Sequence, residues 1–204
     1  MNKSTLLLAA SLLPLLSACN STPRTPEAPA ASAPPAAWVG EARQLATSVP
    51  PRLLSVLAAE IEQGGPAHAI SVCQVEAPRM ARAASEASGW QIRRVSLGNR
   101  NPKAVPDAWE RATLQEFDRQ QAAGADVSQL ERAEVVTENG QQVRRYMRAL
   151  PVQAICLQCH GQADKLGPGV AARLSELYPQ DKGTGYLLGQ VRGAMTLRQN
   201  VQQY

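Results

Sequence analysis

Apolar residues recur every three or four positions through the N-terminal half of the chain, the spacing that places them on one face of a helix. This pattern predicts three successive helices, over 41–48, 51–63 and 66–88. The third helix carries an apolar face that includes Cys73. Because proline lacks the backbone N–H that a helix interior needs, Pro78 predicts a kink or a restart of this helix just after Cys73.

Apolar and polar residues alternate in the second half of the chain, which favours β-strands. Two such segments, 133–137 and 142–150, flank Asn139-Gly140, a dipeptide typical of a type I′ hairpin turn. The other expected elements are a strand over 90–97, a helix over 107–121 with Asp107 as its N-cap, a short helix over 169–177, and two short strands within 185–197 broken by Gly189 and Gly193. The order of elements predicts the α+β class, with N-terminal helices and an antiparallel sheet in a single domain.

The N-terminus has the features of an export signal. Residues 1–18 carry a lysine at position 3, near their start, which is followed by an apolar run that is too short to span a bilayer. Leu16-Ser17-Ala18-Cys19 resembles the lipobox of bacterial lipoproteins, which predicts cleavage before Cys19 and acylation of its thiol. The acyl chains would anchor the protein to a membrane surface, and Asn20 favours the outer membrane. The alternative is an ordinary signal peptide with an incidental cysteine.

Residues 19–37 are rich in Pro, Ala, Ser and Thr, which predicts a disordered tether. The remaining stretch, 38–204, has the length of one domain. Cleavage before Cys19 removes one lysine and lowers the formal net charge from +4 to +3. This charge is small and scattered, so the composition argues against a protein that binds nucleic acid.

The run Cys156-Leu157-Gln158-Cys159-His160 has the C-x-x-C-H pattern of covalent haem c attachment. Two thiols at this spacing can form thioethers with the two vinyl groups on one edge of a porphyrin, and the next imidazole is then held against the haem plane. We therefore predict one haem c, attached through Cys156 and Cys159, with His160 as the proximal iron ligand. The export signal supports this interpretation, because an exported chain passes the haem-ligation machinery of its compartment.

Two other kinds of site would use the same cysteines. Cys73, Cys156, Cys159 and His160 would make a Cys₃His zinc site, although two ligands at adjacent positions strain a tetrahedral geometry. A thioredoxin-like dithiol is the second alternative. That motif normally follows a strand within a βαβ pattern, which this half of the chain lacks.

The group on the other side of the iron would decide its chemistry. The candidates are His68, Cys73, Met80, Met147 and Met195. His68 lies about 140° round the helix from Cys73, on a polar face that we expect to be solvated, and methionines are more often core residues than ligands. Cys73 is either a buried free thiol that packs as a small hydrophobe or a thiolate whose pKa is lowered by Fe(III).

Five motifs follow one another along 38–204. They are Ala69-Ile70-x-x-Cys73-x-x-x-Ala77-Pro78, Arg94-x-Ser96-x-x-x-Arg100-Asn101-Pro102, Pro106-Asp107-x-Trp109-Glu110, Cys156-x-x-Cys159-His160-Gly161 and Tyr178-Pro179-x-Asp181-x-x-x-Gly185-Tyr186. As a set they resemble the DUF3365 family, c-type haem proteins similar to the cyanobacterial Tll0287 type. Lys103-Ala104-Val105 departs from the asparagine expected before the proline.

The resemblance implies a PAS-like fold and an iron held between His160 and Cys73. An anionic thiolate stabilises Fe(III) over Fe(II), so the implied midpoint potential is low. With both axial positions filled, the ferric iron would be low-spin and would not bind O₂. Reduction or protonation that loosens the thiolate would open a site for CO or NO. Arg93, Arg94 and Arg100 are candidates to neutralise the haem propionates, and solvated surface arginines are the alternative.

The sequence therefore predicts a lipid-anchored c-type haem protein that transfers electrons at low potential or senses redox state outside the cytoplasm. We expect an unidentified redox partner, a location on the periplasmic side of a bacterial membrane, and no enzymatic activity. A CO or NO sensor module that works with a partner protein is the main alternative. A peroxidase-type enzyme ranks lower, because only His68 could supply its distal acid and base.

Overall fold

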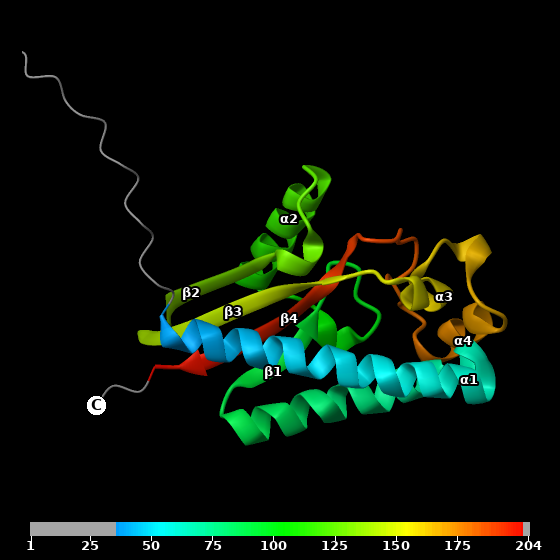
Figure 1. The fold of residues 1–204 in the computed structure, drawn as a ribbon, viewed down its shortest axis with the longest axis horizontal. Helices are drawn as coiled ribbons and strands as arrows, with labels where there is room; N and C mark the ends of the chain where they lie inside the picture. Colours follow the sequence, from blue (N-terminus) through cyan, green and yellow to red (C-terminus); the bar gives the residue numbers. More distant parts are fainter. Residues whose placement is uncertain (1–35, 202–204) are drawn as a thin grey trace, which may run out of the picture. The chain divides into compact units, whose positions relative to one another are not determined.

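A four-stranded antiparallel sheet, in the order β1-β4-β3-β2, forms the centre of the computed structural model, which describes residues 36–201 (Figure 1). The strands are β1 (Gln91–Val95), β2 (Glu131–Glu138), β3 (Gln141–Pro151) and β4 (Val191–Asn200). The expected α+β class and antiparallel sheet are confirmed. The expected signal peptide, Cys19 and all but the last two residues of the expected tether lie outside the described residues.

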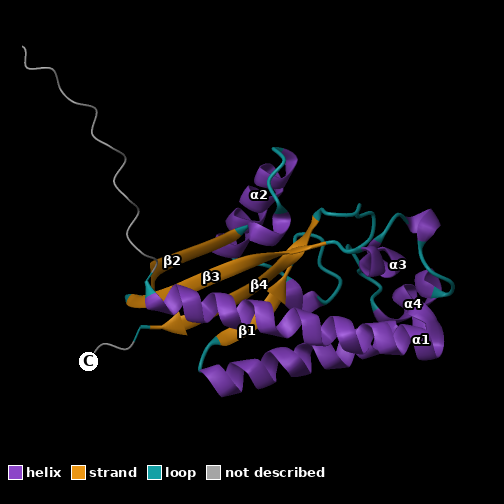
Figure 2. Ribbon diagram, in the orientation of Figure 1, coloured by secondary structure: helices purple, strands orange, loops and turns teal. Residues whose placement is uncertain are grey.

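Helix α1 (Ala37–Ser88) takes the place of the three helices expected from the sequence. It is interrupted at Gly65 (φ 78°, ψ 174°), where the chain reverses so that its two arms lie side by side (Figures 1 and 2). We call residues 37–64 the first arm and residues 66–88 the second arm. The alternative of a helix restart at Pro78 is wrong, because this proline lies inside α1 among residues with helical dihedral angles. Packing of the flanking residues outweighs the local cost of one proline, about 3 kcal/mol.

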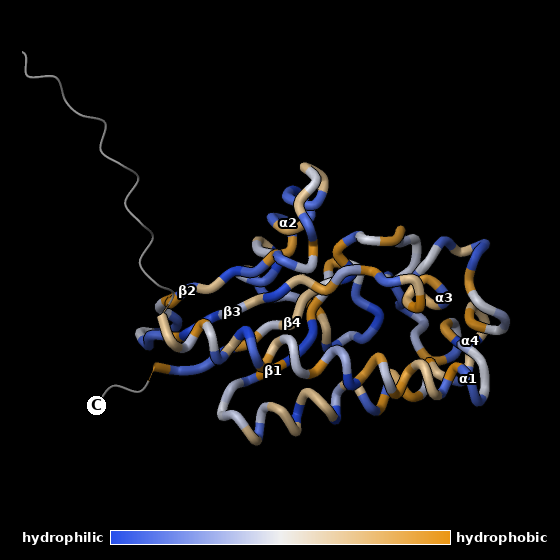
Figure 3. Tube along the Cα trace, in the orientation of Figure 1, coloured by the Kyte–Doolittle hydropathy of each residue, from blue (hydrophilic) through white to orange (hydrophobic). Residues whose placement is uncertain are grey.

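The two faces of the sheet are covered by different helices (Figure 2). The first arm packs on one face, and hydrophobic positions recur along it (Figure 3). Its contacts join Val39, Ala42, Ala46 and Val49 to Trp90, Ile92, Tyr146, Met195 and Leu197. Helix α2 (Ala108–Ala122) packs on the other face through Leu114 and Phe117, against Val95, Met147, Ala149 and Ala194. The predicted N-cap of α2 is confirmed, since Asp107 and Glu110 form a capping box.

Glycine positions explain the strand connections. Asn139 and Gly140 have φ values of 51° and 78°, as the predicted type I′ turn between β2 and β3 requires. The prediction of two short strands broken at Gly193 is wrong, because β4 runs unbroken through this residue. A Cβ at position 193 would collide with the carbonyl oxygen of Val95. Glycine therefore lets β1 and β4 approach closely instead of ending the strand.

The remaining helices gather near the turn at Gly65, where the two arms of α1 meet (Figure 1). Helices α3 (Leu157–His160) and α4 (Val170–Leu177) follow the sheet, and the predicted helix over 169–177 is confirmed. A small core joins Ile70 of the second arm to Val170, Leu174 and Tyr178. Short 3₁₀ turns connect the elements: η1 (Pro102–Ala104), η2 (Val127–Gln129), η3 (Ala154–Cys156) and η4 (Ala163–Lys165). Within residues 36–201, no helix has the length and apolar composition of a membrane span.

Candidate functional site

A cavity of about 520 Å³ is enclosed by the two arms of α1, the sheet and the segment around α3. Its volume lies in the range of about 300–1,000 Å³ that is typical of small-molecule sites. Both arms give it apolar walls, which include Leu53, Leu54, Leu57, Ile61, Ala69, Ile70 and Ala77. The same cavity is lined by Cys73, Cys156, Cys159 and His160. The structure thus brings together the four residues that the sequence predicted for the haem site.

The local structure explains how these side chains reach the cavity. Cys73 lies on the second arm one turn after Ile70, whose contacts with α4 fix this part of the helix. Cys156 and Cys159 are three residues apart on the continuous helical stretch of η3 and α3, so they lie on one side of it. All three cysteines have free thiols.

The His160 imidazole is fixed through one of its two ring nitrogens. Nδ1 lies 2.6 Å from the carbonyl oxygen of Gly183. A carbonyl oxygen can only accept a hydrogen bond, so Nδ1 carries the proton and Nε2 keeps its lone pair. Burial holds the pKa of His160 well below its usual range, and the positive charges of Arg192 and Arg100 lower it further. A neutral imidazole anchored in this way is the form that binds a metal.

Asp181 holds the loop that carries Gly183. Its Oδ1 accepts hydrogen bonds from the Gly183 backbone N–H at 2.7 Å and from Arg100 Nε at 3.1 Å. Arg100 also donates to the carbonyl oxygen of Cys159 at 2.6 Å, so the pair ties this loop to the C-x-x-C-H segment. Both side chains are nearly buried, at 11% and 12% exposure. The sequence singled out Asp181 within a motif but assigned it no role.

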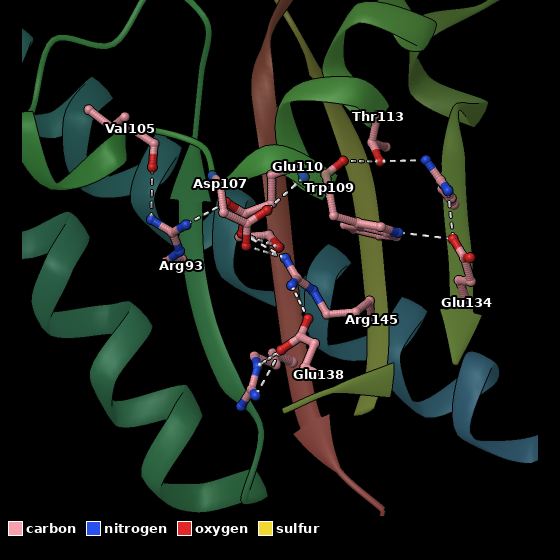
Figure 4. A network of polar contacts seen from close by, with 12 residues as sticks. Arg93, Val105, Asp107, Trp109, Glu110, Thr113, Glu134, Glu138 and Arg145 are labelled. Atoms are coloured by element: carbon pink, nitrogen blue, oxygen red, sulfur yellow. Dashed lines mark hydrogen bonds and ion pairs between the residues drawn. The ribbon is translucent and has the colours of Figure 1, made fainter. Parts of the chain in front are cut away.

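Arg93 and Arg94, which the sequence analysis treated alike, point to opposite faces of the sheet because side chains alternate along β1. Arg93 contributes to the cavity wall, but its guanidinium donates to Glu110 and to the carbonyl oxygens of Lys103 and Val105, in a polar network on the α2 face (Figure 4). Arg94 points to the opposite face, as Ile92 does, and borders the cavity. Of the three arginines proposed for the propionates, Arg93 and Arg100 pair with carboxylates, whereas Arg94 pairs with none within residues 36–201.

Arg192 is a cavity residue that the sequence did not indicate. Its side chain is buried at 6% exposure, and one terminal nitrogen donates to Ser96 Oγ at 2.9 Å and to the Gly98 carbonyl oxygen at 3.1 Å. The guanidinium lies 5.0 Å from the centre of the Tyr186 ring. Burial lowers the pKa of Arg192 to about 10, and the nearby charge of Arg94 contributes. Its role depends on contacts across nearly 100 residues of sequence, which no local pattern reveals.

Of the other candidate ligands of the iron, only Met195 touches the cavity, and His68, Met80 and Met147 do not line it. His68 is half exposed and its Nε2 lies 3.0 Å from Glu60. Met147 is buried in the core on the α2 face, and Met195 is a core residue that also touches the cavity. Met80 packs against the core under the first arm.

The residues of the cavity fit a haem better than a zinc ion. Among the described residues, no group of three or more His, Cys, Asp or Glu side chains is arranged to hold a metal ion, which leaves the Cys₃His alternative without support. Burial raises the pKa of Cys73, and it raises that of Cys159 to about 11. Apolar walls, two thiols one turn apart and an imidazole with a free Nε2 instead match what a porphyrin requires.

Comparisons with known proteins agree with this geometry. The model of the family described as Tll0287-like matches residues 19–200. The fold aligns with the crystal structure of the cyanobacterial heme-protein Tll0287 at a TM-score of 0.62 and 25% sequence identity, over 84% of this chain and 100% of that chain. No curated protein sequence matches significantly.

Proposed function

This chain belongs to the Tll0287-like family, and from that premise we propose that it is a lipid-anchored c-type haem protein for low-potential electron transfer or redox sensing outside the cytoplasm. The observation that carries the proposal is the convergence of Cys73, Cys156, Cys159 and His160 on one largely apolar cavity. The haem, when bound, supplies one-electron exchange between ferric and ferrous iron.

Each of the four residues has a distinct task in this proposal. Cys156 and Cys159 hold the porphyrin through thioethers. His160 binds the iron through Nε2, while the hydrogen bond from Nδ1 to Gly183 keeps the ring in place. Cys73, on the second arm of α1, would supply a second protein ligand to the iron. The apolar side chains of both arms would exclude water from the site.

A second function, a CO or NO sensor that acts with a partner protein, is favoured by the surroundings of Cys73. Burial raises the pKa of its thiol above the usual value, and the charges of Arg94 and Arg100 only partly oppose this. The thiolate therefore depends on the charge of ferric iron for its stability. Ferrous iron would stabilise the thiolate less than ferric iron, and a neutral Cys73 thiol would bind the iron less tightly than a diatomic gas could.

We propose no enzymatic activity, because His68 is exposed and bound to Glu60 and does not line the cavity. A peroxidase would need an acid and base beside the iron. Our proposal places the chain on the periplasmic side of a membrane, preferably the outer one, through acylation of Cys19. Its partner would be a redox protein.

The experiment that tests the proposal compares wild type with Cys73→Ala, both matured in a host with haem-ligation machinery. We expect mass spectrometry to find one covalent haem, and EPR to show a low-spin signal of imidazole–thiolate ligation that Cys73→Ala loses. Met80→Leu is the matched control, since Met80 lies on the same arm and should leave the signal unchanged. An unaltered spectrum in Cys73→Ala would reduce Cys73 to a packing residue. A matured wild type without haem would refute the proposal as a whole.

A further inference from the structure

The charged residues that line the cavity are all cationic. They are Arg82, Arg93, Arg94, Arg100, Lys103 and Arg192, and none of the described residues in the cavity wall is Asp or Glu. Charge of one sign around low-dielectric walls concentrates a potential inside the cavity. Such a cavity favours a ligand that is mostly apolar and carries negative groups.

Four of these six side chains are already committed to other contacts or to solvent. Arg93 pairs with Glu110, and Arg100 pairs with Asp181. Arg82 and Lys103 are exposed, where water solvates their charges. Two cations remain, and no carboxylate of the described residues accepts a hydrogen bond from either. Arg192 is buried. Arg94 is exposed, but its charge interacts with Cys73, Cys156 and Arg192 beside the cavity.

Arg94 and Arg192 lie beside the cavity without a carboxylate partner among the described residues. Arg94 borders the cavity from β1, and no oxygen within residues 36–201 accepts a hydrogen bond from its guanidinium. Within the described part of the chain, Arg192 is buried, donates to neutral acceptors only, and has a buried Nε without a partner. The positive charge of Arg94 opposes that of Arg192, and burial adds a desolvation cost to Arg192, whereas Arg94 is exposed where it borders the cavity. An anion placed between the cavity and these guanidinium groups would relieve both costs.

We propose that Arg94 and Arg192 form a carboxylate subsite, which binds the acid groups of the tetrapyrrole and restricts the cavity to a macrocycle with free carboxylates. The inference rests on the proposed function, because it presumes that the cavity holds a tetrapyrrole. Arginine suits this task, since its planar guanidinium binds a carboxylate through two parallel hydrogen bonds. Two such groups match the two propionates of haem.

The test uses the full chain without haem, with Cys156→Ala and Cys159→Ala so that binding is reversible. Haem and its dimethyl ester, in which both carboxylates are blocked, are titrated into this protein and followed by absorbance. We expect haem to bind at least about tenfold more tightly than the ester. Arg94→Gln should remove most of this difference by weakening haem and leaving the ester unchanged. Arg93→Gln is the matched control, because it removes the same charge from the same strand and should preserve the difference.

Three results would overturn the subsite. Equal affinity of the Cys156→Ala, Cys159→Ala protein for haem and for the ester would overturn the subsite, although haem binding itself would stand. Equal weakening of both ligands by Arg94→Gln would assign Arg94 to packing or to the Cys73 sulfur. Binding of neither ligand would refute the proposed function together with the subsite.

A second measurement serves if the unloaded protein does not fold. In the covalently loaded chain, Arg94→Gln should lower resistance to urea more than Arg93→Gln, although Arg93 has the stronger protein contacts. The opposite order would contradict the subsite.

Discussion

Single residues around His160 determine how strongly its imidazole can donate to a metal. The hydrogen bond from Nδ1 depends on the position of the Gly183 carbonyl, and Asp181 holds this loop through the Gly183 N–H and Arg100. Partners of this kind orient a ligating histidine and raise its basicity. Asp181 is therefore a positioning residue, which acts on His160 through two hydrogen bonds, one to each side of Gly183.

Asp181→Asn should raise the midpoint potential of the loaded protein. The amide keeps the size of the side chain but loses the charge that holds Arg100, so the His160 hydrogen bond loosens and ferric iron is stabilised less. We expect stability to fall by about 1–3 kcal/mol. Redox titration and thermal unfolding measure the two effects, and Asp164→Asn on exposed η4 is the control. A potential equal to that of wild type would show that Asp181 does not act through the imidazole.

The residue scale also shows which parts of the site a sequence can reveal. The spacing of Cys156, Cys159 and His160 is the one that covalent haem attachment requires, and five consecutive residues are enough to recognise it. The hydrogen-bond acceptor of His160 is the backbone carbonyl of Gly183, and no residue type in the sequence indicates such a backbone contact. Arg93 and Arg94 differ only by strand alternation, and the face that each occupies depends on the pairing of β1 with β4.

Whole elements were predicted where local signals decide their ends, and mispredicted where packing decides. The capping box of α2 and the Asn139-Gly140 turn are local and were found. Pro78 and Gly193 are local signals as well, but the contacts of their neighbours override them. The cavity depends on both kinds of information. The break at Gly65 agrees with the predicted helix end at 63 and helix start at 66, but the return of the second arm, which brings Cys73 over the sheet, depends on packing.

Glu131 links three elements and should make their stability depend on pH. It accepts hydrogen bonds from Arg43 of the first arm at 2.9 Å, from Tyr146 of β3 at 2.6 Å and from Arg148 at 3.0 Å. The Arg43 hydrogen bond is the main cause that lowers the pKa of Glu131 to about 2. A carboxylate with a lowered pKa in the folded state stabilises the protein above its unfolded value of about 4.5, and this contribution is lost as pH falls towards 2.

Glu131→Gln should therefore flatten the acid limb of the stability curve. The free energy of unfolding of wild type should fall by about 1–2 kcal/mol more than that of the variant between about pH 5 and pH 2. This energy is smaller than the full pKa shift implies, because Arg43 and Glu131 are partly exposed to solvent. Chemical unfolding at several pH values measures this difference. Glu116→Gln, which removes an exposed pair within α2, is the control and should follow wild type. Parallel curves for Glu131→Gln and wild type would contradict the linkage.

At the scale of the whole molecule, the sheet with α2 and the first arm forms a frame, and the second arm completes the cavity. The frame has its own continuous cores on both faces of the sheet. The second arm contributes only Met80 and Ala84 to the edge of one of them, and Ile70 to the small core with α4. Most of its inner face, including Ala69, Cys73, Ala77 and Ala81, borders the cavity instead. The stability of the second arm should therefore depend on what fills the cavity.

Removal of the haem should loosen the second arm and leave the frame ordered. An unfilled apolar cavity deprives the arm of packing contacts, and the unneutralised charges of Arg94 and Arg192 add to the cost. Hydrogen exchange of the loaded and unloaded full chain should show faster exchange over 66–88 without haem, with little change in α2 or in β2 and β3. Segments of low local stability open first, so the difference should appear within the earliest exchange times. Uniform loosening of all elements would mean that the haem stabilises the domain as one cooperative unit, and equal protection in both forms would mean that the second arm needs no ligand.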